Sequence, residues 1–385
     1  MMHICLDTRS TGRSGGTGVA TYARMLEKAC ETEGLEHSRL LDLQRGSPDL
    51  NPHSLPRQIS RLLQASFSER RVQRNGIHYQ VNDLYRTATV RSRTWHKITY
   101  LESPEPPSLM HWTYPLPLMW KNTRNVVTIH DIIPILHPEY GSFSKAEMQR
   151  LLLQCCEQAD GIVTVSKAVQ ADLISELGIA EDKITLLPQA VSFSDEELQE
   201  ARYAPPPCPG DGFLYFGSIE KRKNIGRIIT AHGLSRTSRP LTLIGNQGFG
   251  AKAELAALHT HPRPDLVHLI PWCSRSALIR AIQEARAVVY PSLAEGFGLP
   301  IIEAMMLGTP VITSFGHATE EIAQQAALLV SPLDVKEISE AIHRIGTNDL
   351  LYLSLIQAGL MRAEVFQFPS YARKVGNFYR NFIRN

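Results

Sequence analysis

The sequence predicts an α/β protein of two doubly wound domains that face each other across a cleft. Three observations carry this prediction. The chain has 385 residues, which is long for a single core and suits two domains. Short β-branched runs alternate with amphipathic stretches, a pattern typical of parallel sheets covered by helices on both faces. A proline-rich stretch interrupts this alternation near the middle of the chain.

The first half of the chain supplies one series of alternating elements. Strands are expected at 3–7, 125–131 and 161–166, and helices at 19–30, 147–159 and 167–177. The second half repeats the pattern. Strands are expected there at 213–218, 241–245, 287–292 and 310–313, and helices at 224–233, 276–285 and 299–307. Each series can close its own parallel sheet, with right-handed crossovers between neighbouring strands.

The stretch between the two series reads "LPQAVSFSDEELQEARYAPPPCPGDG". Its run of prolines before Gly210 can neither extend a helix nor join a central strand, which is typical of a linker. We therefore expect an N-terminal domain at 1–190, a linker at 191–210 and a C-terminal domain at 211–365. The closing segment at 366–385 is expected to form a helix that crosses back toward the first domain.

Composition excludes several classes of protein. Apolar residues make up 43% and charged residues 20%, and the net charge is +2, so nothing indicates nucleic acid as a partner. The start, "MMHICLDTRS", has no basic region followed by an apolar one, and no stretch approaches the roughly 18 apolar residues of a spanning helix. The six cysteines lack zinc-site spacing. We expect a cytoplasmic protein with reduced cysteines.

The stretch "YPSLAEGFGLPIIEAMMLGTPVIT", residues 290–313, carries the strongest signal. Gly296 and Gly298 allow the backbone to approach a ligand closely. Pro300 suits the first position of a helix, whose free amides can hold a phosphate. Glu303 is placed to accept hydrogen bonds from a ribose, and Glu295 to hold sugar hydroxyls.

Three other segments complete the expected site. "FGSIEKRKNIGRII", residues 216–229, supplies cations for phosphate in Arg222 and Lys223. The loop "GRSGGTGVATYARML" contains Gly16 and Gly18, although by itself it is an incomplete dinucleotide fingerprint. The third segment is "VVTIHDIIPILHPEYG", in which His130 and Asp131 end a predicted strand.

Together these motifs resemble the GT-B retaining glycosyltransferases of glycosyltransferase family 4. The resemblance covers most of the chain and is weakest at about 35–105. It implies a nucleotide-sugar donor, with Lys223 on the diphosphate and His130 near the anomeric carbon. The donor loop would be formed by Gly296, Phe297, Gly298 and Leu299. "HWTYPLPLMW" resembles the loop that lines the acceptor side, with His111, Trp112 and Tyr114. Many members have an arginine where this chain has Ser218.

The resemblance implies transfer of a hexose to a hydroxyl with retention at the anomeric carbon. His130, Glu295 and Asp131 are the expected catalytic residues. No D-x-D metal motif is present, so we expect no metal and no cofactor besides the donor. Mannose from GDP-mannose is the expected donor, with a UDP-sugar as the alternative. The expected acceptor is a lipid-linked saccharide or a glycan in surface polysaccharide or glycolipid assembly.

Residues 56–100 carry nine basic and two acidic side chains, partly on an amphipathic stretch. Such a segment either lies on an anionic membrane at the cytoplasmic face or is a solvated face. Three alternatives to a transferase of surface polysaccharide or glycolipid assembly remain open: an epimerase of the same fold, a glycogen-synthase-like transferase, and a non-catalytic scaffold or sugar-binding subunit. The sequence indicates neither the oligomeric state nor the linkage formed.

Overall fold

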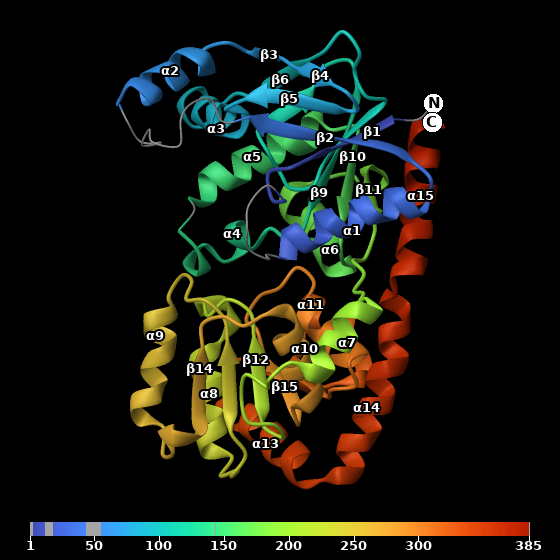
Figure 1. Ribbon diagram of the computed structural model, residues 1–385. Coiled ribbons are helices and arrows are strands. Elements are labelled where there is room, and N and C mark those ends of the chain that lie inside the picture. Colours follow the sequence, from blue (N-terminus) through green and yellow to red (C-terminus); the bar gives the residue numbers. More distant parts are fainter. Residues whose placement is uncertain (1–2, 12–17, 44–54, 143, 385) are drawn as a thin grey trace.

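The computed structural model describes residues 3–11, 18–43, 55–142 and 144–384 of the chain. Two α/β domains lie one above the other, and the last two helices of the chain follow one side of the molecule, α14 (Asp349–Ala363) beside the lower domain and α15 (Phe368–Arg384) beside the upper one (Figure 1). The sheets of the two domains are separate. This is the predicted fold class.

The N-terminal domain is built on an eight-stranded sheet in the order β11-β10-β9-β7-β1-β2-β5-β4. Every neighbouring pair is parallel except β4 with β5. The strands are β1 (His3–Asp7), β2 (Glu36–Leu43), β4 (Gln73–Asn75), β5 (His78–Asn82), β7 (Leu109–Trp112), β9 (Arg124–Ile129), β10 (Gly161–Thr164) and β11 (Ile184–Leu186). The helices are α1 (Gly18–Thr32), α2 (Leu55–Ala65), α3 (Leu84–Trp95), α4 (Ile133–Leu136), α5 (Lys145–Gln158) and α6 (Lys167–Leu177).

A second, three-stranded sheet joins β3 (Glu69–Arg71), β6 (Thr99–Glu102) and β8 (Leu118–Trp120) in that order. None of the strands within residues 35–105 was predicted from the sequence. β2 reads "EHSRLLDL" and β4 reads "QRN", so neither has the apolar run of a buried central strand. β2 is held between β1 and β5, and β4 pairs with β5, whose Tyr79 and Val81 are buried in the domain core.

The C-terminal domain has a six-stranded, all-parallel sheet in the order β14-β13-β12-β15-β16-β17. The strands are β12 (Phe213–Phe216), β13 (Leu241–Ile244), β14 (Val267–Ile270), β15 (Ala287–Tyr290), β16 (Val311–Ser314) and β17 (Leu328–Val330). The helices are α8 (Ile225–Leu234), α9 (Ala251–Leu255), α10 (Arg275–Glu284), α11 (Leu299–Met306), α12 (His317–Ala323) and α13 (Val335–Thr347). The strand runs "FLYF", "LTLI", "AVVY" and "VITS" are buried throughout, as expected for a sheet covered on both faces.

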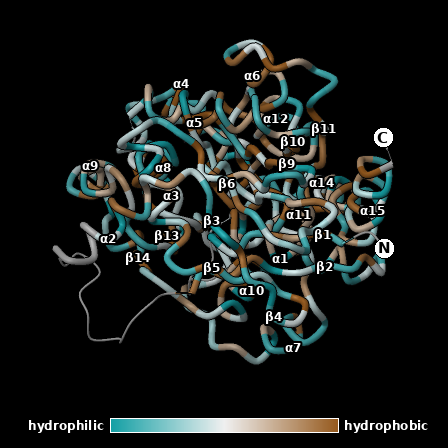
Figure 2. Tube along the Cα trace, turned by 90° about the horizontal axis from the view of Figure 1, so that it is seen from above, coloured by the Kyte–Doolittle hydropathy of each residue, from teal (hydrophilic) through white to brown (hydrophobic). Residues whose placement is uncertain are grey.

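The chain passes between the domains twice. The first passage follows β11 and leads to helix α7 (Asp195–Tyr203), which the proline run ends at its C-terminal side. The second leads from α14 (Asp349–Ala363) into α15 (Phe368–Arg384), which packs against α1 of the N-terminal domain. Figure 2 shows α15 and both chain ends at one edge of the molecule, with α2 and α9 at the opposite edge. In the described part of the chain, every helix is too short or too polar to cross a bilayer.

Candidate active site

In the N-terminal domain the site is built where three parallel strands end side by side. Asp7, the last residue of β1, is buried, and its carboxylate accepts hydrogen bonds from the amide (2.5 Å) and hydroxyl (2.8 Å) of Thr113, just beyond β7. The Thr113 carbonyl in turn accepts a hydrogen bond from Nε2 of His130, which follows β9, at 2.9 Å. Because this carbonyl can only accept, Nε2 carries the proton. Asp7 and Thr113 therefore fix the orientation of the His130 ring.

The other nitrogen of His130 also has a partner. The side-chain amide of Gln189 donates to Nδ1 at 3.3 Å, and Tyr22 packs edge-on against the ring. Burial lowers the pKa of the imidazole below its usual value. The ring is thus neutral at pH 7, and its environment suits orientation of a ligand better than capture of a proton.

In the C-terminal domain, Glu295 is the centre of a buried ionic cluster. The loop after β15 carries Glu295, and a short 3₁₀ helix (Lys221–Lys223) after β12 carries its cations. Lys223 bonds to Glu295 Oε1 and to the Tyr290 hydroxyl. That hydroxyl lies 3.0 Å from the same carboxylate oxygen, and Arg222 donates to Oε2 at 3.0 Å. Both oxygens of the carboxylate are therefore engaged.

These contacts determine how the cluster is charged. Burial alone would raise the pKa of Glu295, but Lys223 and Arg222 lower it to about 2. Burial lowers the pKa of Lys223, and Glu295 opposes that change. Arg222 also pairs with Glu220 at 2.8 Å. Two cations face two carboxylates, so a diphosphate bound here would have to share Lys223 and Arg222 with protein carboxylates.

The glycine-rich turn after Glu295 contacts the first domain. A Cβ on Gly296 would lie 1.9 Å from the carbonyl oxygen of His130, so no larger residue fits without moving the domains apart. Gly298 has a φ of 109° and precedes α11, whose first turn has Pro300 but no capping side chain in the described structure. Leu299 reaches to 3.8 Å from the Cβ position of Gly18. Phe297 is buried and packs edge-on against Phe366.

Glu303 lies beyond the first turn of α11. Arg275 donates to one of its carboxylate oxygens at 2.9 Å, so only part of the carboxylate is available to a ribose. Burial raises the pKa of Glu303, an effect that Arg275 opposes. The ribose-binding role stays a prediction.

The acceptor-side prediction is wrong for two of its three residues. His111 and Trp112 are fully buried in β7. His111 bonds to the Tyr379 hydroxyl (2.6 Å) and to Thr128 (2.7 Å), and Trp112 donates to Asn125 at 3.0 Å. Their aromatic and polar atoms serve the core because "LMHW" is a central strand and not a loop. Tyr114, half-buried just after the strand, is the one that can still face an acceptor.

Two predicted site residues, Asp131 and Gly16, remain to be placed. Asp131 precedes α4 and accepts a hydrogen bond from the Ile133 amide at 3.1 Å, and it lies beside Gly296. Gly16 lies outside the described residues. Among the residues that the structure describes, no three His, Cys, Asp or Glu side chains gather as metal ligands would. All six cysteines are free.

The structure adds contacts between the two domains that sequence reasoning missed. The carboxylate of Glu321 accepts hydrogen bonds from the Lys167 and Ala168 amides at the start of α6, both at 2.9 Å. Ser166 donates to the Gly296 carbonyl at 2.7 Å. Glu321 lies in the stretch "ATEEIAQQAALLV", but a hydrogen-bond acceptor supplied to a helix by another domain leaves no mark in local sequence.

Comparison with known proteins identifies the family of the chain. Residues 210–361 match the family model described as glycosyl transferases group 1, and residues 16–194 match the model of glycosyltransferase family 4. O-antigen chain mannosyltransferase B of Escherichia coli is 29% identical over 267 residues, covering 67% of this chain and 70% of that protein. O-antigen chain mannosyltransferase RfbU of Salmonella typhimurium is 28% identical over 233 residues, covering 60% and 62%.

Solved structures resemble the chain over its whole length. Sucrose-phosphate synthase from Thermosynechococcus elongatus has a TM-score of 0.72 at 18% identity, covering 99% of both chains. HepE of Anabaena, solved in complex with UDP and glucose, has a TM-score of 0.68 at 15% identity, covering 99% of this chain and 100% of that one. At these identities the likeness concerns the fold.

Proposed function

Because the chain belongs to glycosyltransferase family 4 and has the GT-B fold, we propose that it transfers mannose from GDP-mannose to a hydroxyl of a lipid-linked or glycan acceptor. The proposed setting is surface polysaccharide or glycolipid assembly, with retention at the anomeric carbon and without a metal ion. The observation that carries the proposal is the Glu295–Lys223–Arg222 cluster, which the Gly296 turn holds against His130 of the other domain. The names of the mannosyltransferase relatives support the choice of sugar.

Each part of the site has a task in this reaction. Breaking the bond between sugar and diphosphate develops negative charge on the leaving group. Lys223, Arg222 and the amides at the start of α11 would stabilise that charge. Glu295 keeps the two cations in place. Since both of its oxygens are engaged by other side chains, Glu295 is poorly suited to act as a nucleophile.

We therefore favour attack from the face that the diphosphate leaves. The acceptor oxygen bonds to the anomeric carbon while the bond from that carbon to the phosphate oxygen breaks. The proton of the acceptor hydroxyl passes to the departing phosphate oxygen. The neutral His130, oriented through Thr113, would contact the sugar close to the anomeric carbon. Contact between the Gly296 turn and His130 would exclude water from the reacting bond.

A donor screen by thermal unfolding tests the proposal. GDP-mannose, UDP-glucose and ADP-glucose are added separately to the protein in the presence of EDTA. A ligand that binds only the folded state raises the unfolding temperature by mass action. We expect a rise with GDP-mannose alone, which Lys223→Ala abolishes and the exposed-surface change Glu340→Ala preserves. A rise with UDP-glucose alone would favour the UDP-sugar alternative. No rise with any donor would favour a non-catalytic scaffold.

Retention is tested separately on the product. Proton NMR of the freshly formed glycoside reports whether the anomeric configuration of the donor is kept. An inverted product would contradict the proposed same-face attack, even if GDP-mannose proves to be the donor.

Contact with the membrane is the last part of the proposal. Helix α2 exposes the apolar side chains of Leu62 and Leu63, and Phe67 just after the helix is exposed as well. The exposed fraction of Leu63 is 64%. Basic side chains of the same segment would attract anionic lipid. Co-sedimentation with phosphatidylglycerol vesicles tests this contact. We expect Leu63→Ser to weaken it, whereas equal binding by wild type and variant would contradict it.

A further inference from the structure

The N-terminal domain contains a pocket of about 580 Å³ away from the Glu295 cluster. It opens where β2 and β5 end, between α2, β3 and the start of α3. β2 and β5 run parallel to β1, so the pocket lies at the same sheet edge as Asp7 and His130. Ligands of open parallel sheets bind at this edge. Four arginines line the pocket: Arg61, Arg70, Arg71 and Arg86.

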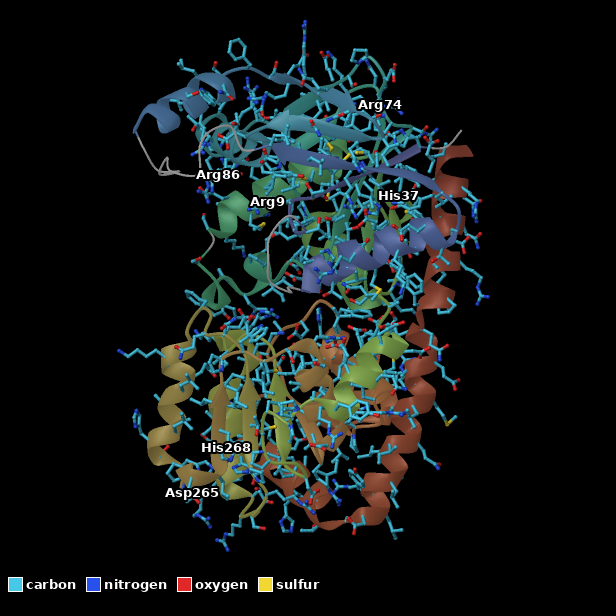
Figure 3. All side chains as sticks on the ribbon, in the orientation of Figure 1. Arg9, His37, Arg74, Arg86, Asp265 and His268 are labelled. Atoms are coloured by element: carbon cyan, nitrogen blue, oxygen red, sulfur yellow. The ribbon has the colours of Figure 1, made fainter. Side chains whose placement is uncertain are left out.

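The charges of the pocket do not cancel. Arg61 pairs with Asp83 at 2.5 Å, and Glu69, the other acidic lining residue, pairs with Lys121 at 2.9 Å. Within the described ranges, neither Arg71 nor Arg86 forms an ion pair, and both are exposed. Figure 3 shows Arg86 below α2, and Arg9 between it and the lower domain. The pocket therefore presents at least two guanidinium groups to a ligand.

Arg70 has a different role in the pocket. It donates to Gln64 of α2 (2.9 Å) and to the Asn82 carbonyl at the end of β5 (2.7 Å). These hydrogen bonds tie the helix to the strand and set the width of the pocket. Leu43 and Phe67 form its apolar part, and 68% of the Phe67 surface is exposed. The pocket thus combines fixed cations with an apolar edge.

We propose that this pocket binds the phosphate or diphosphate group of the acceptor, an inference that rests on the proposed transferase function. Guanidinium groups match the oxygens of a phosphate in pairs of hydrogen bonds. Leu43 and Phe67 would contact an apolar chain attached to that phosphate. Four strand spacings separate β9 from β5, or about 19 Å. The anionic group would therefore lie at the end of the acceptor remote from the hydroxyl that receives the sugar.

Calorimetric titration with inorganic pyrophosphate tests the pocket. The protein is first saturated with GDP, so that the donor site is occupied and its integrity is measured independently. We expect the double variant Arg71→Gln/Arg86→Gln to bind pyrophosphate about tenfold more weakly or worse, because it loses two charge-assisted contacts. The matched control, Arg93→Gln/Lys97→Gln, removes two exposed charges of the same basic segment outside the pocket, and we expect it to bind like wild type.

The outcomes separate the pocket from the transferase proposal. If the pocket variant binds pyrophosphate as tightly as wild type, the pocket does not bind the anion. Equal losses of pyrophosphate affinity in the pocket variant and the control variant would also contradict the proposal. Loss of GDP binding would count against the donor site instead. Phosphatidylcholine vesicles with and without farnesyl diphosphate show which kind of acceptor carries the phosphate group. If the protein binds only vesicles that contain farnesyl diphosphate, and the pocket variant does not, the acceptor is lipid-linked. If the protein binds pyrophosphate but not these vesicles, the acceptor is a water-soluble phosphorylated glycan.

Discussion

Glu295 shows how a single buried residue can organise a site of opposite charges. Only 8% of its surface is exposed, yet its pKa is low because Lys223 and Arg222 repay the cost of burying the carboxylate. A buried ion pair of this kind adds little net stability compared with an apolar core. Removing one member is a different matter, because the remaining charges stay buried without a partner.

Glu295→Gln is therefore expected to lower the free energy of unfolding by about 3 kcal/mol or more at pH 7. The pH dependence has a definite sign. The folded-state pKa is about 2, below the usual value of 4.5. The contribution of the carboxylate is thus fully present above pH 4.5 and is lost as the pH falls toward 2. Urea unfolding across that range should show a steeper loss in wild type than in the variant.

The sequence identified the residues of the cluster but not their mutual contacts. Glu295, Lys223 and Arg222 were predicted from local motifs as separate ligands of sugar and diphosphate. That Glu295 holds both cations follows from the proximity of two loops separated by 72 residues, as the Lys223 contact illustrates. His111 was misplaced for a similar reason, because its partners lie on other strands and on α15.

At the scale of elements, the first turn of α6 is bonded to a carboxylate of the other domain in addition to its own cap. Ser166 is the local cap and accepts from the Val169 amide at 3.2 Å, while Glu321 supplies a carboxylate from α12. A negative charge at a helix start is favourable. Since this charge belongs to the other domain, the same interaction holds the two domains together.

Glu321→Ala should weaken that attachment while leaving each domain folded. We expect a larger radius of gyration in small-angle X-ray scattering, and GDP-mannose affinity reduced by about three- to tenfold, in line with one lost charged hydrogen-bonding group. The control Glu340→Ala removes an exposed carboxylate of α13. Unchanged scattering in the Glu321 variant would contradict the role of this contact.

Helix α15 is tied to the first domain by a buried hydrogen bond. The Tyr379 hydroxyl bonds to His111, and Tyr379→Phe would leave that imidazole nitrogen without its partner. We expect a loss of about 1–3 kcal/mol in unfolding free energy, with faster amide exchange along α15. Tyr371 gives a matched control, because its buried hydroxyl has no hydrogen-bond partner among the described residues. Tyr371→Phe should cost little, and equal costs would argue against the His111 contact.

Secondary-structure elements were predicted well where their own residues form a clear apolar pattern. Four of the six strands of the C-terminal sheet were predicted as short apolar runs, and their bounds match closely, as for 287–292 against β15 (Ala287–Tyr290). The other two, β14 and β17, were not predicted. β2 and β4 lie near the edge of the other sheet and carry charged or polar side chains. Such strands depend on their neighbours, and local periodicity does not reveal them.

At the scale of the whole molecule, the approach of the two domains depends on a missing side chain. Gly296→Ala would place a methyl group 1.9 Å from the His130 carbonyl oxygen, and only separation of the domains relieves that overlap. We expect the variant to keep the stability of each domain while its transfer rate falls by at least about tenfold, since a small misplacement in an active site has that effect. Gly346→Ala, with ordinary contacts at 3.5 Å, is the control.

The two-domain plan was readable from the sequence, but the closed contact between the domains was not. The repeated β/α alternation and the proline run predicted two sheets. The fit of Gly296 against His130 depends on the relative position of two rigid bodies, which no local pattern encodes. The positive charge of residues 56–100 was likewise evident from the sequence. That four arginines of this stretch line one pocket was not, because the fold brings them together.

The two passages of the chain between the domains are bonded to each other. The Val191 amide donates to the Phe366 carbonyl at 3.1 Å, and Val191 pairs with Gln367 as an isolated bridge. Two connecting segments that are hydrogen-bonded to each other resist twisting of one domain relative to the other far more than a single segment does. The domains can therefore open chiefly by rotation about a single hinge axis along this edge. The opposite edge, where α2 and α9 lie (Figure 2), travels farthest, so a long acceptor enters most easily from there.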